Sequence, residues 1–218
     1  MLLEARDVHK AYPGTDGPIP VLSGVSLTLA AGESLALTGE SGSGKSTFLH
    51  LLGALDHADA GEILVDGTSV ASLDDAGRAA LRRDKIGLVF QQFNLIPSLS
   101  VADNLAFQAR LAGRADVGWL GELGDRLGLG AVLRQYPEQL SGGQQQRVAI
   151  GRALAPRPAV VLADEPTGNL DEETAAEVMA LMLDLVRETS AGLLMVTHSS
   201  TLAGQLDRRV HLSRGRLA

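Results

Sequence analysis

The chain has 218 residues, which suits a single α/β domain with a sizeable core. Hydrophobic residues make up 45% and charged residues 21%, so the composition excludes a largely disordered protein, and the absence of cysteine excludes disulfide staples and suits a reducing cytoplasm. The formal net charge of −7 argues against a broad nucleic-acid-binding surface, and no apolar stretch approaches the ~18 residues that span a bilayer. We therefore expect no nucleic-acid partner and no segment of this sequence that spans a membrane.

The N-terminal region predicts strands and turns. Residues 2–8 and 21–29 have the composition of strands around a turn-rich insert at residues 15–18, and residues 61–65 predict a further strand. Acidic residues interrupt residues 1–7 before any apolar region forms, so these residues do not predict a signal peptide.

A phosphate-binding motif follows at residues 39–46. It fits G-x-x-x-x-G-K-[ST], in which Gly39, Gly42 and Gly44 let the backbone turn back and point its amides at phosphate oxygens. An apolar run before the motif predicts a buried strand, and residues 47–52 have helical spacing, which is the context that the motif requires. We expect Ser41 and Thr47 among the further nucleotide contacts.

The end of this motif supplies charge and a metal ligand. The helix N-terminus adds partial positive charge, Lys45 adds a full charge near the β- and γ-phosphates, and the Ser46 hydroxyl can bind Mg²⁺. The alternative is a turn rich in glycine and serine with an incidental lysine, which the flanking strand and helix argue against. The motif predicts a nucleoside triphosphate site that uses Mg²⁺.

The next strand, Ile86–Phe90, leads into an unusual segment. Gln91 stands at its end, either as a surface glutamine or as part of the site. Residues 93–99 are too apolar for an ordinary loop, and an exposed apolar stretch marks a protein interface. The alternative is that these residues simply cover the core.

A second glycine-rich helix start lies at residues 140–144, after two segments of helical periodicity at 101–111 and 117–127. Ser141 is a good N-cap, Gly142 and Gly143 expose backbone amides, and residues 144–154 continue as a helix. One chain thus has two phosphate-binding helix starts but only one nucleotide site. The second helix start has a role if it serves the nucleotide site of another subunit. A bare helix cap is the alternative.

Residues 159–165 form an apolar run that ends in two acids. They predict a buried parallel strand whose carboxyl end opens into a crevice, where ligands of doubly wound sheets bind. Asp164 is expected to hold Mg²⁺ through water, and Glu165 to polarise the attacking water, because phosphoryl transfer needs mainly positioning, charge neutralisation and an oriented nucleophile. The alternative is that both acids cap the turn before Pro166.

Together these motifs resemble the ATP-binding-cassette (ABC) family from end to end. The resemblance implies an α/β P-loop ATPase with a RecA-like core, an antiparallel β-subdomain and an inserted α-helical subdomain at about residues 98–139, all within one domain at residues 1–218. It also implies ATP and Mg²⁺ as ligands and hydrolysis of ATP to ADP and phosphate.

The resemblance assigns roles that the residues alone leave open. Gln91 matches the glutamine that contacts Mg²⁺ and water and links the core to a membrane partner, and His198, after a strand at 193–197, matches the histidine that contacts the γ-phosphate. Tyr12 matches the aromatic residue that stacks on adenine, although a tyrosine in the core of an edge strand is the rival interpretation.

Ser141 and Gly143 would complete the ATP site of a second copy packed head to tail. Asp171 would belong to the loop through which the copies sense each other, although N-capping also explains it.

The family also implies partners and a location. A multi-spanning permease would dock near residues 93–99, ATP would drive formation of a homodimer, and the chain would lie at the cytoplasmic face of the cell membrane. Three segments, at residues 49–56, 90–97 and 163–171, look most like the branch of lipoprotein-releasing, macrolide-exporting and cell-division ATPases. We expect export or lipoprotein or lipid release; the alternative is a non-transport ATPase, such as a subunit of a cell-division mechanotransmission or regulatory complex.

Other ATPase classes fit the chain less well. A chromosome or repair ATPase would need a long coiled-coil insert between Gln91 and Ser141, and the interval here is short and punctuated by glycine. A nucleotide kinase would leave Ser141 and His198 without a role. Soluble translation factors of this superfamily usually carry two cassettes, and this chain has one.

Overall fold

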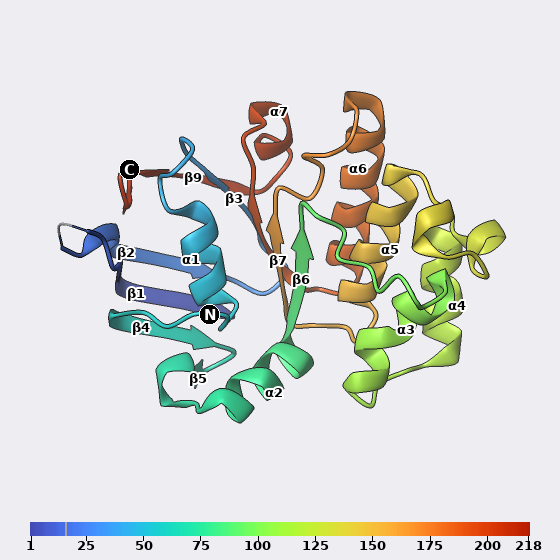
Figure 1. Ribbon diagram of the computed structural model, residues 1–218, viewed down its shortest axis with the longest axis horizontal. Helices are drawn as coiled ribbons and strands as arrows, with labels where there is room; N and C mark the ends of the chain where they lie inside the picture. Colours follow the sequence, from blue (N-terminus) through green and yellow to red (C-terminus); the bar gives the residue numbers. More distant parts are fainter. Residues whose placement is uncertain (16) are drawn as a thin grey trace.

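A six-stranded sheet forms the centre of the computed structural model, which describes residues 1–15 and 17–218 (Figure 1). The strand order is β10-β9-β3-β8-β7-β6, and β9, β3, β8, β7 and β6 run parallel while β10 pairs antiparallel with β9. The bounds are β3 (Ser34–Thr38), β6 (Ile86–Phe90), β7 (Val160–Asp164), β8 (Gly192–Val196), β9 (Arg208–Ser213) and β10 (Arg216–Leu217). Because β3, β8 and β7 are adjacent parallel strands, the segments that follow them meet at one edge of the sheet.

The two faces of this sheet pack against different layers. Alternate residues of β7 show the division: Val161 and Ala163 belong to one hydrophobic cluster with residues of α5 and α6, whereas Val160 and Leu162 belong to a second cluster with α1. Because both faces are covered, β3 and β8 are buried along their whole length. This explains the apolar runs at residues 35–37 of β3 and 193–196 of β8.

A second sheet, antiparallel and four-stranded, packs on the α1 side of the core. Its order is β2-β1-β4-β5, with β1 (Leu3–Tyr12), β2 (Ile19–Leu29), β4 (Ala60–Val65) and β5 (Thr68–Ser69). The predicted antiparallel β-subdomain is confirmed, and β1 runs four residues beyond the predicted end at residue 8, to Tyr12. The predicted insert at residues 15–18 includes Asp16, which lies outside the described residues.

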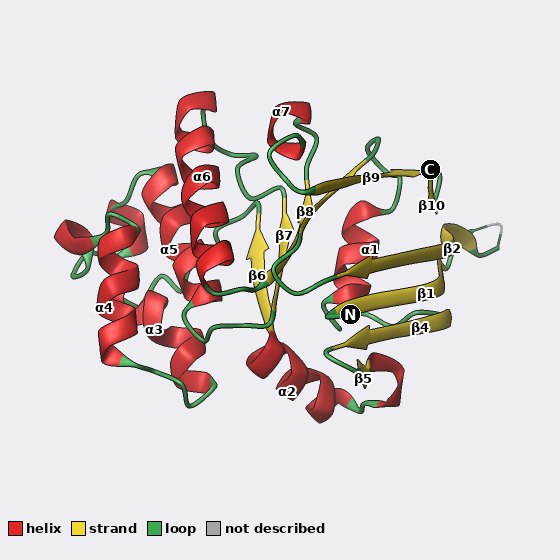
Figure 2. Ribbon diagram, turned by 180° about the vertical axis from the view of Figure 1, so that it is seen from behind, coloured by secondary structure: helices red, strands yellow, loops and turns green. Residues whose placement is uncertain are grey.

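Helices gather on the other side of the central sheet (Figures 1 and 2). There α3 and α4 lie beyond α5, and Leu105, Trp119 and Leu127 share one hydrophobic cluster with Val148 and Leu154 of α5. The α-helices are α1 (Lys45–Leu52), α2 (Asp75–Lys85), α3 (Val101–Leu111), α4 (Val117–Arg126), α5 (Gly142–Leu154), α6 (Glu172–Glu188) and α7 (Ser200–Ala203), and the 3₁₀ helices are η1 (Val70–Ser72), η2 (Gly130–Val132) and η3 (Pro137–Gln139). α3 and α4, which lie between residues 98 and 139, therefore share a hydrophobic core with α5.

No helix within the described part of the chain combines the length and apolar character needed to cross a membrane.

Candidate functional site

The phosphate loop lies between β3 and α1 and surrounds a cavity of ≈ 230 Å³. Eight residues that the sequence predicted at one nucleotide site line this cavity together with Val21: Ser41, Gly42, Gly44, Lys45, Ser46, Thr47, Glu165 and His198. The last two come from the ends of β7 and β8, more than a hundred residues away in the chain. The parallel register of the central sheet brings them to the loop.

Glycine is required at two points of the loop because of close backbone contacts. Gly39 has a φ of 153°, and a Cβ atom there would lie 2.2 Å from the carbonyl oxygen of Leu212 in β9. Gly44 has a φ of 101°, and its Cβ would lie 2.9 Å from the carbonyl oxygen of Val21. The loop is therefore seated against β9 and β2, and larger residues at either position would displace it.

The Lys45 side chain is held inside the loop. It is 6% exposed, and its Nζ donates hydrogen bonds to the carbonyl oxygens of Gly39 at 2.9 Å and Glu40 at 2.7 Å. Burial lowers the pKa of Lys45, while the carboxylates of Glu165 and Asp164 act in the opposite direction. The ammonium group is thus positioned at the cavity by weak neutral acceptors that phosphate oxygens can replace.

A carboxylate and an imidazole meet on the wall of the same cavity. His198 Nε2 lies 2.8 Å from Glu165 Oε1, and the backbone N–H of Glu165 donates to the carbonyl oxygen of Val196 in β8 at 3.0 Å. Glu165 has a φ of 45°, in the left-handed region that glutamate rarely adopts. This backbone turn lifts the carboxylate from the end of β7 toward His198 and the phosphate loop.

Gln91 does not line the cavity, because Asn169 holds its side chain. Gln91 Nε2 donates to Asn169 Oδ1 at 3.1 Å, and Asn169 Nδ2 donates to the Gln91 carbonyl oxygen at 2.9 Å. A Cβ at Gly168 would lie 2.9 Å from Gln91 Nε2, so glycine makes room for the pair. The sequence did not reveal this contact, since the two residues are 78 positions apart.

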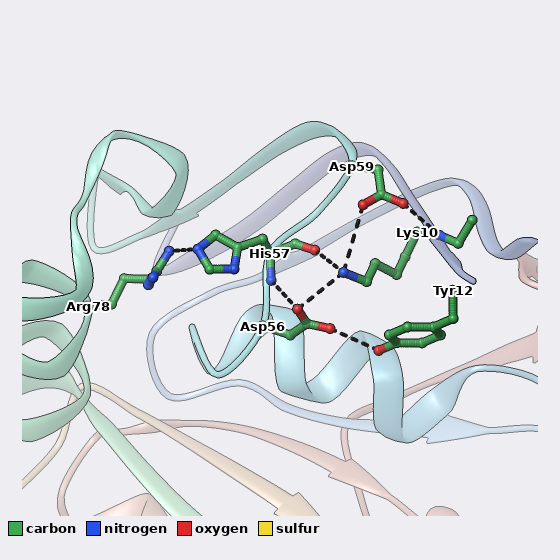
Figure 3. A network of polar contacts seen from close by, with 7 residues as sticks. Lys10, Tyr12, Asp56, His57, Asp59 and Arg78 are labelled. Carbon is green, nitrogen blue, oxygen red and sulfur yellow. Dashed lines mark hydrogen bonds and ion pairs between the residues drawn. The ribbon is translucent and has the colours of Figure 1, made fainter. Parts of the chain in front are cut away.

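Tyr12 lies outside the phosphate cavity, within a polar network (Figure 3). Its hydroxyl donates to Asp56 Oδ2 at 2.9 Å, and Lys10 Nζ donates to Asp56 Oδ1 at 3.1 Å and to the His57 carbonyl oxygen at 2.7 Å. Lys10 Nζ also lies 5.1 Å from the centre of the Tyr12 ring, and Arg78 of α2 contacts the His57 ring at the far end of the network. Tyr12 is 38% exposed, so it is no core residue of an edge strand.

The charges of this network stabilise one another. Burial raises the pKa of Asp56, but hydrogen bonds from the His57 backbone, Tyr12 and Lys10 outweigh it and lower the pKa overall. Burial, followed by the hydrogen bond to Asp56, raises the pKa of Tyr12. Asp56 therefore stays ionised and anchors Tyr12 to the segment that follows α1.

Three predicted contacts stand apart from the cavity in the single chain. Ser141 caps α5: its Oγ accepts from the N–H of Gln144 at 3.3 Å, and the Gln144 side chain accepts from the Ser141 N–H at 2.9 Å. The helix begins at Gly142, two residues before the predicted start. Asp171 caps α6 through a bond from the N–H of Thr174 at 2.9 Å. Ser141, Gly143 and Asp171 do not line the phosphate cavity of their own chain.

A larger cavity of ≈ 640 Å³ lies between α2, β6, α3 and α5, and we call it the α2–α5 cleft. Leu111, which is 56% exposed, lies on its wall. The full lining is Ala76, Ala79, Ala80, Arg82, Arg83, Ile86, Gly87, Leu88, Phe90, Gln108, Leu111, Arg152, Ala153 and Pro156. Both apolar side chains and three arginines line it.

The apolar segment at residues 93–99 adjoins this cleft but is only partly exposed. Leu95 packs against the core, and Phe93 and Ile96 are half-buried. Arg152 donates to the carbonyl oxygens of Asn94 at 2.6 Å and Phe93 at 3.1 Å, while the fully buried Asn104 bonds to both the N–H and the carbonyl oxygen of Ile96. The expectation of an exposed apolar stretch is thus corrected: Leu95 packs against the core, and Phe93 and Ile96 are only partly exposed.

Comparisons with known proteins agree with these motifs. The family model described as ABC transporter matches residues 22–168. The lipoprotein-releasing system ATP-binding protein LolD of Hahella chejuensis (strain KCTC 2396) is 44% identical over 224 residues, covering 100% of this chain and 95% of the relative. LolD of Maricaulis maris (strain MCS10) is 46% identical, covering 99% of this chain and 96% of the relative.

Solved structures of similar fold include the dimeric post-hydrolysis state of the ATP-binding cassette MJ0796 bound to ADP and Pi. That chain is 38% identical, with a TM-score of 0.90 and coverage of 99% of this chain and 96% of the other. A second dimeric structure, of MJ0796 as a bacterial ABC transporter cassette, has the same identity, TM-score and coverage. The protein belongs to the ABC transporter family, as an ATP-binding cassette.

Proposed function

We propose that this cassette is the ATP-hydrolysing subunit that powers a membrane permease. The observation that carries the proposal is the meeting of Glu165 and His198, 2.8 Å apart, on the wall of the cavity that the phosphate loop encloses. The family and the relatives named LolD support the same function.

Within the cavity each side chain has a distinct task. Lys45 exchanges the carbonyls of Gly39 and Glu40 for oxygens of the β- and γ-phosphates, and the amides of the loop and of the α1 N-terminus bind the remaining oxygens. Glu165 orients the attacking water and accepts its proton. His198 contacts the γ-phosphate and fixes the position of the Glu165 carboxylate.

The donor set suits Mg²⁺. Ser46 and Asp164 offer a hydroxyl and a carboxylate, and Gln91 would offer an amide oxygen once its side chain turns away from Asn169; all three are hard oxygen ligands. Across residues 1–15 and 17–218 there is no group of three or more His, Cys, Asp or Glu able to hold a metal ion. An ion that takes part of its coordination from phosphates and water needs no such group. When bound, it would neutralise charge on the β- and γ-phosphates.

Two copies would form the working unit. Ser141 and Gly143 present an anion-binding helix start that the single chain does not direct at its own cavity, and Asp171 lies exposed at the start of α6. Head-to-tail packing lets the start of α5 in one copy close the nucleotide site of the other. The dimeric arrangement of the similar cassette bound to ADP and Pi supports this proposal.

The permease would dock at the α2–α5 cleft and the adjoining residues 93–99. The cleft is hollow and carries the exposed side chain of Leu111. Its wall residue Phe90 is followed directly by Gln91, so a short stretch of main chain would link the nucleotide site to the docking surface. The chain would therefore lie at the cytoplasmic face of the membrane. Release of lipoproteins, or of related lipid-linked cargo, is the transport step that the LolD relatives favour.

The experiment is capture of the tagged chain from membranes, with an ATPase assay of the captured complex. We expect a multi-spanning subunit and hydrolysis that depends on Glu165. Absence of both would contradict the proposal. The alternative, a non-transport cassette in a cell-division or regulatory complex, would be favoured if the captured complex hydrolyses ATP yet releases no lipid-linked cargo from vesicles.

A further inference from the structure

Gln91 and Asn169 form a pair in which each residue both donates and accepts a hydrogen bond. Gln91 Nε2 donates to Asn169 Oδ1 at 3.1 Å, and Asn169 Nδ2 donates to the main-chain carbonyl oxygen of Gln91 at 2.9 Å. We call this pair the Gln91–Asn169 clasp. It joins the segment that follows β6 to the segment between β7 and α6.

The main-chain bond determines which way both side-chain amides face. Because a carbonyl oxygen can only accept, the group of Asn169 that meets it must be the NH₂ group. The oxygen of Asn169 then faces Gln91, so Gln91 must present its own NH₂ group to it. The clasp therefore occupies Gln91 Nε2, and Gln91 Oε1 accepts no hydrogen bond from residues 1–15 or 17–218.

Two consecutive turns hold Asn169 in place relative to Glu165. The N–H of Gly168 donates to the carbonyl oxygen of Glu165 at 3.0 Å, and the N–H of Leu170 donates to the carbonyl oxygen of Thr167 at 3.1 Å. Asn169 lies inside the second turn. The oxygen that holds the Gln91 side chain is thus fixed relative to the wall of the phosphate cavity.

The clasp also lies beside the donors proposed for Mg²⁺. Phe90 is paired in register with Asp164 on the neighbouring parallel strand, so Gln91 leaves β6 next to Asp164. The Gln91 side chain nevertheless does not line the phosphate cavity while Asn169 holds it. One side chain cannot stay on Asn169 and also turn to a metal ion at the phosphates, so the two positions exclude each other.

We propose that Asn169 is a positioning residue that competes with Mg²⁺ for the side chain of Gln91. The inference rests on the proposed function and deepens it, because Asn169 then sets how much the metal strengthens nucleotide binding. For Gln91 to reach the metal, only the bond from Nε2 to Asn169 Oδ1 has to break. The net effect of one neutral hydrogen bond on an equilibrium is about two- to tenfold.

The test compares the affinity of the full chain for a non-hydrolysable ATP analogue with and without Mg²⁺. The ratio of the two affinities is the metal factor. Asn169→Ala removes the clasp, Gln91→Ala removes the proposed metal ligand, and the double variant removes both. Gln92→Ala is the matched control, because it removes a neighbouring exposed amide that takes no part in the clasp.

We expect the metal factor to rise about two- to tenfold in Asn169→Ala, because the competing hydrogen bond is gone. It should fall in Gln91→Ala, and the double variant should match Gln91→Ala, since the competition exists only while Gln91 is present. Gln92→Ala should leave the factor unchanged. Affinity without metal should be the same in all variants, because neither clasp residue lines the phosphate cavity.

A second measurement tests the clasp without nucleotide or metal. In nuclear magnetic resonance spectra the side-chain NH₂ signal of Gln91 is identified by its loss in Gln91→Ala. Its protons should exchange with water faster in Asn169→Ala than in the wild type, because they lose their acceptor. Equal exchange in the two chains would show that the clasp does not hold Gln91 in solution, and the inference would fail.

Two results for the metal factor of Asn169→Ala would also overturn the inference. An unchanged factor would mean that Asn169 does not compete with the metal. A lowered factor would mean that Asn169 presents Gln91 to the metal instead. Both results leave the proposed donor set standing as long as Gln91→Ala lowers the factor. If Gln91→Ala leaves the factor unchanged, Gln91 is no metal ligand, and that part of the proposed function fails together with the inference.

Discussion

The phosphate cavity and the α2–α5 cleft differ in how far their charged groups satisfy one another. In the phosphate cavity Glu165 meets His198 at 2.8 Å, and Lys45 is enclosed by its own loop. In the cleft, the hydrogen bonds of Arg82 and Arg152 to other described residues go only to backbone carbonyls. The charged groups of the phosphate cavity thus have partners within the chain, whereas Arg82 and Arg152 have no carboxylate partner among the described residues.

The largest expected effect falls on the phosphate cavity. Glu165→Gln keeps the shape of the side chain but removes the base, so turnover should fall at least ~10²-fold, the usual scale for a positioned base. ATP affinity should stay near the wild-type value. Steady-state hydrolysis and equilibrium ATP binding of the same preparations measure the two quantities. Unchanged hydrolysis would remove Glu165 from this role and leave the cavity as a binding site only.

Lys45→Ala provides the contrast within the same cavity, because it should lose nucleotide binding itself. It deletes the charge that faces the phosphates.

A second prediction asks whether the phosphate cavity is complete in one chain. ATP should convert the Glu165→Gln protein from monomer to dimer in light scattering. Adding Ser141→Arg should weaken that dimer at least about thirtyfold, as for an unpaired charge buried at an interface. The Ser141→Arg monomer must still bind ATP, since Ser141 does not line its own cavity.

Mixing sharpens this test. Lys45→Ala and Ser141→Arg chains can together build one intact composite site, so the mixture should recover activity that neither variant has alone. Full activity of Ser141→Arg by itself would contradict the arrangement.

The third prediction concerns the cleft. Leu111→Asp replaces an exposed apolar side chain on the cleft wall, so association with the membrane subunit should weaken about tenfold, because a carboxylate must be desolvated there. ATPase activity of the isolated chain should stay within about threefold, since no nucleotide contact changes. A pull-down beside an ATPase assay measures both.

Val117→Asp is the matched control for Leu111→Asp. Val117 is 86% exposed on α4 and does not line the cleft, so its substitution should leave association intact. Equal losses from both variants would mean that the partner docks elsewhere. Leu95 is unsuitable for this purpose, because it packs against the core and its replacement tests folding.

The smallest effect is expected at the edge of the phosphate site. Asp56→Ala frees the Tyr12 hydroxyl and Lys10, so the ring should lose its fixed position and ATP affinity should fall about two- to tenfold, corresponding to an aromatic contact of ~0.5–1.5 kcal/mol. Affinity for tripolyphosphate, which lacks a base, should not change. A loss for both ligands would show that Asp56 supports the fold instead.

Local patterns explain why much of the phosphate site could be predicted from the sequence. The glycines, Lys45 and Ser46 all lie within residues 39–46. An apolar strand precedes this segment, and a helix with apolar residues at helical spacing follows it. Glu165 and His198 follow buried strands, so the parallel sheet brings them to the same edge.

Long-range contacts and polar elements explain what could not be predicted. The bond between Gln91 and Asn169 spans 78 positions, and that between Tyr12 and Asp56 spans 44. The helix α2 buries only Leu81 and is rich in charged residues, so few large apolar side chains mark it in the sequence, and the cleft beside it is assembled from several separate elements. The burial of Leu95 depends on the same packing, which is why residues 93–99 were expected to be more exposed.

The contact between Gly39 and β9 also makes the protein suitable for optical measurement. The phosphate loop rests on Leu212, and the N–H of Gly215 in the following turn donates to the carbonyl oxygen of Ser43 at 3.2 Å. Arg214 is exposed at the tip of that turn, and the sequence contains no cysteine. Arg214→Cys would therefore create a unique thiol for a fluorescent dye, whose emission would follow the filling and emptying of the loop in real time.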